Sequence, residues 1–157
     1  MQYRAYTSAD RQACLAIFDS NAERFFAPHE RAYFETFLES PSGFFGVLCD
    51  DQGSVVGCGG FGSRDDGTTV DLTWGMIHSS RQSQGLGKFL AFARFKRLAD
   101  FPNLQKVKMN TSNETVGFFL KLGFHVVEHI SHGYRQGLDR YELEMVVTKE
   151  VRARWIQ

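Results

Sequence analysis

The chain has 157 residues, and its 18 lysines and arginines balance 18 aspartates and glutamates. This length predicts one domain, which we place at residues 1–150 with a short C-terminal tail at 151–157. A net charge of zero argues against a nucleic-acid partner and against a polybasic membrane anchor. The N-terminus lacks an apolar signal segment and no apolar run approaches membrane-spanning length, so we expect no membrane partner.

The cysteines indicate a redox environment. Their number is odd, no CxxC pair occurs, and two of the three (Cys14, Cys49 and Cys58) lie in apolar strand-like runs. These features favour buried free thiols in a reducing compartment, so we expect a cytoplasmic protein.

The first half of the chain predicts helices followed by antiparallel strands. The expected elements are a strand at 1–5, a helix at 7–22, a helix at 28–40 and three strands between 44 and 80. Thr7 or Ser8 is the expected N-cap of the first helix, and Pro28 opens the second. Turn signals at 50–53 and 64–67 separate the three strands.

The second half alternates between helices and strands. The expected elements are a helix from Gly85 to Phe101, a strand at 106–112, a helix at 113–124, and strands at 125–130 and 140–147 joined by a loop at 131–139. Pro102 closes the first of these helices and Gly123 is the C-cap of the second. This order predicts the mixed α/β class, a mixed sheet with helices on its faces.

Two glycines, Gly85 and Gly87, stand where an apolar strand gives way to a helix. A P-loop is excluded because Gln82 replaces its first glycine and Phe89 follows Lys88, and a Rossmann fingerprint would need a third glycine. Backbone N–H groups in a tight loop at a helix start form an anion-binding concavity, which glycine leaves open to a diphosphate. A strand–helix turn that binds nothing is the alternative interpretation.

Residues 82–87, Gln-x-x-Gly-x-Gly, resemble the acyl-CoA-binding motif of the GNAT acetyltransferase superfamily, and residues 111–124 resemble its asparagine-to-Gly-Phe segment. The resemblance implies a GNAT fold, with a mixed sheet of six or seven strands that splays between the fourth and fifth strands. It implies acetyl-CoA as cosubstrate. The residues it places at the cofactor are Met76, Ile77, His78, Gln82, Ser83, Gln84, Gly85, Leu86, Gly87, Lys88, Asn113, Phe118 and Phe119.

The chain departs from the family where a general acid is expected. Many members carry a tyrosine in the last helix to protonate the departing thiolate, and this chain has Phe119 there. A phenylalanine cannot donate a proton, so the role is vacant or filled elsewhere. A thiol has a pKa of about 8.5, which makes thiolate a fair leaving group without help. Asn113 also stands one residue closer to the Gly-Phe pair than is common.

No residue is uniquely placed as the general base, and Glu30 and Asp71 are the candidates. Glu30 belongs to a loop that overhangs the acceptor pocket in this family, although a helix N-terminal glutamate is also ordinary dipole chemistry. Asp71 precedes the end of the fourth strand, where a merely solvated carboxylate is the alternative. The expected acceptor contacts are Phe26, Glu30, Trp74 and Tyr134.

The histidines do not predict a metal site. In a strand, His125 and His129 share a face but lie roughly 13 Å apart, too far to hold one ion, so we expect no metal.

The sequence therefore predicts a cytoplasmic N-acetyltransferase that moves an acetyl group from acetyl-CoA to the primary amine of a small molecule by direct attack in a ternary complex. A non-catalytic CoA-binding or sensor module is an alternative, and so is a peptide or protein N-terminal acetyltransferase. The acceptor stays open, as does the oligomeric state, for which a homodimer is one candidate.

Overall fold

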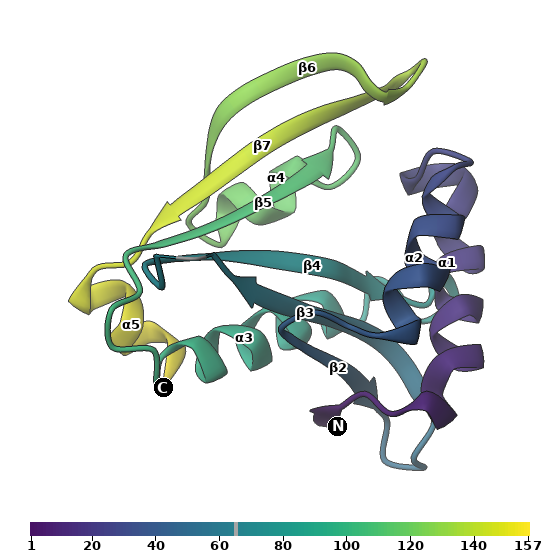
Figure 1. Ribbon diagram of the computed structural model, residues 1–157, viewed down its shortest axis with the longest axis horizontal. Coiled ribbons are helices and arrows are strands. Elements are labelled where there is room, and N and C mark those ends of the chain that lie inside the picture. Colours follow the sequence, from purple (N-terminus) through teal and green to yellow (C-terminus); the bar gives the residue numbers. More distant parts are fainter. Residues whose placement is uncertain (65) are drawn as a thin grey trace.

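The computed structural model describes residues 1–64 and 66–157. It contains one seven-stranded sheet with helices on both faces (Figure 1). The strands are β1 (Gln2–Ala5), β2 (Phe44–Cys49), β3 (Val55–Ser63), β4 (Thr69–Ile77), β5 (Lys106–Ser112), β6 (His125–Arg135) and β7 (Leu138–Val146). The helices are α1 (Arg11–Phe25), α2 (Glu30–Glu39), α3 (Leu86–Leu98), α4 (Val116–Lys121) and α5 (Lys149–Trp155). The strand order is β1-β2-β3-β4-β5-β7-β6, which confirms the mixed α/β prediction.

The sheet splays between β4 and β5, as the resemblance to the family implied. These two strands pair in parallel, and their pairing covers only Thr69–Asp71 and Lys106–Lys108. β4 then continues to Ile77 and β5 to Ser112, so their C-terminal halves separate (Figure 1). Helix α3 makes the crossover that a parallel pair requires.

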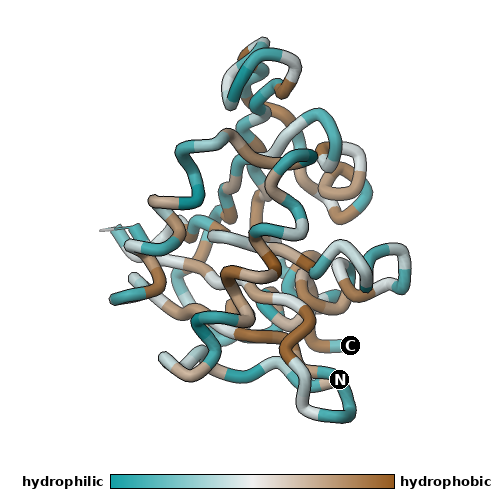
Figure 2. Tube along the Cα trace, turned by 90° about the vertical axis from the view of Figure 1, so that its right-hand side faces the viewer, coloured by the Kyte–Doolittle hydropathy of each residue, from teal (hydrophilic) through white to brown (hydrophobic). Residues whose placement is uncertain are grey.

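Two separate cores pack on opposite faces of the sheet. On one face, Phe18 of α1 and Phe34 of α2 pack with Val47 of β2. On the other face, Phe95 of α3 packs with Val107 of β5, together with parts of α4 and α5. Figure 2 shows hydrophobic segments in the interior of the trace and hydrophilic segments in its outer turns. The two layers pack on β4 from both faces, while the C-terminal half of its edge toward β5 is left without a partner strand.

A β-bulge distorts β4 in its separated half. Cys58 lies opposite Met76 and Gly60 opposite Thr73, so the two residues between them, Trp74 and Gly75, face the single residue Gly59. Trp74 has a φ of 46°, in the left-handed region that a bulky side chain rarely adopts. Such strain is typical of functional sites, and a bulge re-aims the backbone groups of its strand.

The hairpin of β6 and β7 differs from the expectation of a loop at 131–139. Strand β6 continues to Arg135, and the turn is short, with Gly137 at a φ of +79°. The Asp139 carboxylate stabilises the extended arms, because it accepts hydrogen bonds from the His132 backbone N–H at 3.0 Å and from His129 Nε2 at 2.8 Å. The predicted loop was therefore wrong.

Smaller differences concern helix ends. Helix α1 begins after a 3₁₀ turn at Ser8–Asp10 and extends to Phe25, past the expected end at residue 22, whereas α3 ends at Leu98. The expected boundary at residue 150 falls inside α5, whose Trp155 is buried and stacks on Phe95 with ring centroids 5.3 Å apart. Asp65, part of the expected turn at 64–67, lies outside the described residues. None of the described helices is long and apolar enough to cross a membrane.

Candidate active site

A cavity of about 860 Å³ opens where β4 and β5 separate. In open sheets of this kind, ligands bind outside the carboxyl ends of parallel strands. Of the residues expected at the cofactor, those that line the cavity are Met76, Ile77, Gln82, Ser83, Gly85, Gly87, Lys88, Phe118 and Phe119. All of the expected acceptor contacts also line it, namely Phe26, Glu30, Trp74 and Tyr134. The structure thus brings most of the predicted cofactor residues and all of the predicted acceptor contacts to one space.

The loop before α3 presents a run of unused backbone donors at one end of this cavity. Within the described residues, the N–H groups of residues 83–88 donate no hydrogen bond to another residue. Gly85 has a φ of +79°, and a Cβ built on it would meet nothing within 4 Å. Unpaired amides at the positive end of a helix favour an anion, and the open space above Gly85 would admit one.

The side chain of Gln82 holds this loop in place. Its amide Nε2 donates to Asn21 Oδ1 at 2.6 Å and to the carbonyl of Ile77 at 3.1 Å. Asn21, buried in α1, donates to the same carbonyl at 2.9 Å. The loop, α1 and the end of β4 are therefore joined through two amides. Sequence reasoning missed Asn21, although a polar residue on the buried stripe of an amphipathic helix was a visible signal.

Besides Asn113, three residues expected at the cofactor do not line the cavity. His78 caps the 3₁₀ turn at Ser79–Arg81, since its ring nitrogen accepts from the Ser80 N–H at 3.2 Å. Gln84 is exposed, and Leu86 is buried in the core between α3 and the sheet.

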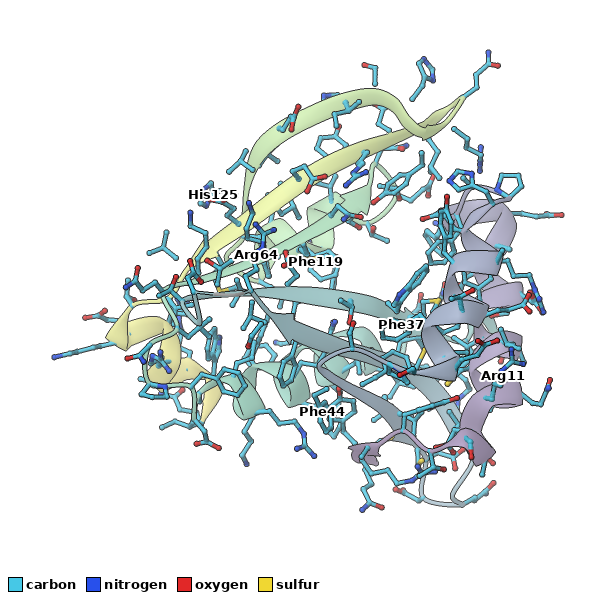
Figure 3. All side chains as sticks on the ribbon, in the orientation of Figure 1. Arg11, Phe37, Phe44, Arg64, Phe119 and His125 are labelled. Carbon is cyan, nitrogen blue, oxygen red and sulfur yellow. The ribbon has the colours of Figure 1, made fainter. Side chains whose placement is uncertain are left out.

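Two further candidates also lie elsewhere. The side-chain oxygen of Asn113 accepts from the backbone N–H of Asp139 at 3.0 Å, which ties the start of α4 to β7. Asp71 pairs with Arg64 through two hydrogen bonds of 2.8 and 2.9 Å, at the end of the sheet where β4 and β5 are still joined. Figure 3 labels Arg64 at this end. Asp71 is thus a surface ion-pair partner outside the cavity, so its proposed role as a base is withdrawn.

The opposite end of the cavity carries a carboxyl and a phenol. The Glu30 carboxylate accepts from the Ala27 N–H at 2.6 Å, and burial raises the pKa of this carboxyl above its ordinary value. The Tyr134 hydroxyl donates to Asn110 Oδ1 at 2.5 Å, and burial raises the pKa of this phenol as well. At neutral pH the Tyr134 side chain is therefore a neutral hydrogen-bonding group.

Side chains from distant parts of the chain close this end. Arg135 of β6 donates to the carbonyls of Glu23 and Phe26, and Arg24 of α1 pairs with Glu114 at 3.2 Å. The β6–β7 hairpin and the start of α4 are thus fixed to the C-terminal end of α1 and to Phe26 just beyond it.

Residues of α3 and α4 also line the cavity. Phe119 projects from α4 toward the space between β4 and β5 (Figure 3). Two polar groups share this region. Thr73 Oγ1 is buried with no hydrogen-bond partner in the described chain, and Arg94 of α3 lines the cavity although only 3% of its surface is exposed. Sequence reasoning missed both. The described residues contain no group of three histidine, cysteine, aspartate or glutamate side chains that could hold a metal ion.

Comparison with known sequences identifies a family. The sequence model of the family described as "Acetyltransferase (GNAT) family" matches residues 14–124. No curated protein matches the chain at a significant level.

Solved structures share the fold at low identity. A spermidine N-acetyltransferase chimera from Vibrio cholerae has a TM-score of 0.76 at 14% identity, covering 99% of this chain and 98% of that one. Ard1 from Thermoplasma volcanium has a TM-score of 0.75 at 18% identity, covering 94% and 98%. An aminoglycoside 6'-N-acetyltransferase complexed with coenzyme A has a TM-score of 0.73 at 14% identity, covering 94% and 98%.

Proposed function

Because the chain belongs to the acetyltransferase (GNAT) family, we propose that it moves an acetyl group from acetyl-CoA to the primary amine of a small molecule, by direct attack in a ternary complex. The observation that carries this proposal is that one continuous cavity holds both predicted ends of the site. It reaches from the unpaired amides before α3, through the gap between β4 and β5, to Glu30 and Tyr134.

The donor end suits the diphosphate of CoA. The amides of residues 83–88 would receive the phosphate oxygens, and Gly85 leaves their approach free of a side chain. Lys88 lines the same end and would add a positive charge. From there the pantetheine arm would follow the unpaired edge of β4 toward the bulge at Trp74 and Gly75.

The acceptor end suits a cationic amine. Glu30 would bind the ammonium form, and Tyr134, held by Asn110, would offer a neutral hydrogen bond beside it. The apolar walls formed by Phe26 and Trp74 would limit the access of water to the reacting atoms. The amine would lose its proton to water or a neighbouring base before it attacks.

A non-catalytic CoA-binding or sensor module is the second candidate. Phe119 favours it, because the usual proton donor of the family is missing from α4. A peptide or protein N-terminal acetyltransferase differs only in the acceptor. We also propose a cytoplasmic location, because Cys14, Cys49 and Cys58 are free thiols.

Steady-state turnover of acetyl-CoA against a panel of small amines and short peptides, read as release of the CoA thiol, separates these functions. We expect turnover with one class of small amines. Turnover with peptide N-termini alone would favour the peptide enzyme. Tight CoA binding with no turnover on any member of the panel would favour the sensor.

A further inference from the structure

Arg94 is a buried cation without a counter-ion. Its Nε donates to the carbonyl of Leu90 at 3.4 Å, and Nη1 and Nη2 donate to no residue in the described part of the chain. Burying an unpaired charge is costly, and natural proteins seldom do so without a partner. The open donors therefore indicate that a group absent from the chain itself meets this guanidinium.

The ionisable side chains that face Arg94 do not compensate its charge. They are Tyr3 of β1 and Cys58 of β3. Burial raises the pKa of Tyr3 to about 12 and raises that of the Cys58 thiol, so both are neutral near pH 7. Burial also lowers the pKa of Arg94, but arginine begins so high that it stays charged. The positive charge of Arg94 therefore makes the electrostatic potential in the cavity more positive.

The guanidinium lies directly under the bulge of β4. A Cβ built on Gly75 would stand 3.0 Å from both Nη1 and Nη2, and one built on Gly59 would stand 3.4 Å from Nη1. The absence of side chains on these two glycines is what allows the charge to approach the strand so closely. Arg94 and Phe119 line the same cavity, from α3 and α4 respectively.

Building on the function proposed above, we propose that Arg94 stabilises the departing CoA thiolate by its charge, in place of the proton donor that Phe119 cannot be. The amine nitrogen attacks the thioester carbon, the new C–N bond forms, and the C–S bond breaks with its electron pair on sulfur. The nitrogen proton goes to water or a neighbouring base. The sulfur leaves unprotonated, held by the guanidinium, and no acid is required.

The pKa of the CoA thiol in the bound state tests this without any acceptor. An opposite charge within about 4–6 Å lowers such a pKa by about 1–3 units. Binding then releases a proton, and the affinity for CoA rises with pH below the ordinary thiol pKa of about 8.5. Calorimetry with the full chain from about pH 6.5 to about pH 8.5 should show a rise of about fivefold or more. S-methyl-CoA, whose sulfur carries no proton, corrects for the other groups at the cavity, including Glu30, Lys88 and Tyr134.

Three variants assign the effect. Arg94→Met should abolish the rise for CoA relative to S-methyl-CoA, and Arg94→Lys should retain most of it. Arg97→Met removes a charge one turn further along α3, where Arg97 stacks on Phe44, and should retain all of it. Equal pH dependence of the two ligands in the wild type overturns the inference, even if Arg94→Met does not fold. An unchanged rise in a folded Arg94→Met variant overturns it as well. If the wild type binds neither ligand, the proposed function itself fails.

Discussion

The Arg135 guanidinium donates a 2.6 Å hydrogen bond to the backbone carbonyl of Glu23, 112 residues earlier in the chain. A second bond, 3.3 Å long, reaches the carbonyl of Phe26. Both acceptors are carbonyls at or beyond the end of α1, so one side chain joins the tip of the β6–β7 hairpin to the segment that carries the Glu30 side of the cavity.

Loss of this link should affect the acceptor more than the donor. Replacing Arg135 with methionine keeps an apolar stem but leaves the two carbonyls without their charged donor, and hydrogen bonds to charged groups contribute about 1.5–3 kcal/mol. We expect the KM for the amine to rise about tenfold or more, while the KM for acetyl-CoA hardly changes. Arg154→Met, on the exposed side of α5, is the matched control and should change neither constant. Equal changes in both constants would show that Arg135 only supports the fold.

Gly85 can be tested against a glycine with the same backbone. Gly85 and Gly53 have φ values of +79° and +84°, and a Cβ on either would meet nothing within 4 Å. Alanine at each position should therefore cost a similar 1–2 kcal/mol of stability, roughly the strain of a left-handed residue. Only Gly85→Ala places a methyl group over the unpaired amides, so it alone should weaken CoA binding in calorimetry. If both variants bind CoA like the wild type, the diphosphate lies elsewhere.

Glu30→Gln should raise stability and impair function at the same time. Because burial raises the pKa of this carboxyl above the ordinary 4.5, the folded state holds the proton more tightly than the unfolded chain does. The stability that the protonated form provides is present below pH 4.5 and is lost as the pH rises through the raised value. The variant should thus melt at a higher temperature than the wild type at pH 7 and at a similar temperature at pH 4.

The same variant should raise the KM for the amine about tenfold, since it removes the charge that would bind the ammonium group. The KM for acetyl-CoA should stay constant. If Glu30 only interacts with the dipole of α2, the opposite change in stability is expected. In that case Glu30→Gln would melt slightly lower at pH 7 and would leave both Michaelis constants unchanged.

Phe119→Leu tests whether the ring has a chemical role. A lost general acid lowers kcat by about 10²–10⁴-fold. Because phenylalanine donates no proton, we expect a much smaller change, with the KM for acetyl-CoA moderately affected. A thousandfold loss of kcat in a stable variant would instead show that the ring positions the reacting atoms.

The sequence predicted the mixed sheet and the loop before α3, because each depends on local signals such as apolar periodicity, turn residues and glycine, whereas the splay of the sheet came only from the resemblance to the family. It failed at 131–139, where glycines and polar residues suggested a loop. There strand β6 continues through an irregularity in its pairing with β7 as far as Arg135, and the Asp139 carboxylate accepts from the backbone of His132, whose φ is 54°. Long-range contacts of this kind leave no local pattern.

The candidate site likewise combines residues that local signals predicted with contacts that only the fold creates. Gln82 and Gly85 were found from their spacing, but the bonds of Gln82 to Asn21 and of Arg135 to Glu23 join residues that only the fold brings together. Arg94 is one of several basic residues on a helix that is polar on its outer side. Its spacing from Leu90 and Leu98 places it on the buried face of α3, but only the fold shows that it lies beneath two glycines.

The three buried cysteines provide a chemical probe of how the core opens. Cys14, Cys49 and Cys58 have exposed fractions of 0%, 5% and 0%, and all three belong to the core between the sheet and the α1–α2 layer. Cys49 also lines a surface pocket, but a thiol-specific reagent can reach Cys14 and Cys58 only when that layer opens, so the rate at which these two are modified in the native chain reports on its opening. Since the same layer carries Glu30, an acceptor amine that binds there should slow the modification, and the cognate amine could be found by this slowing before any turnover is seen.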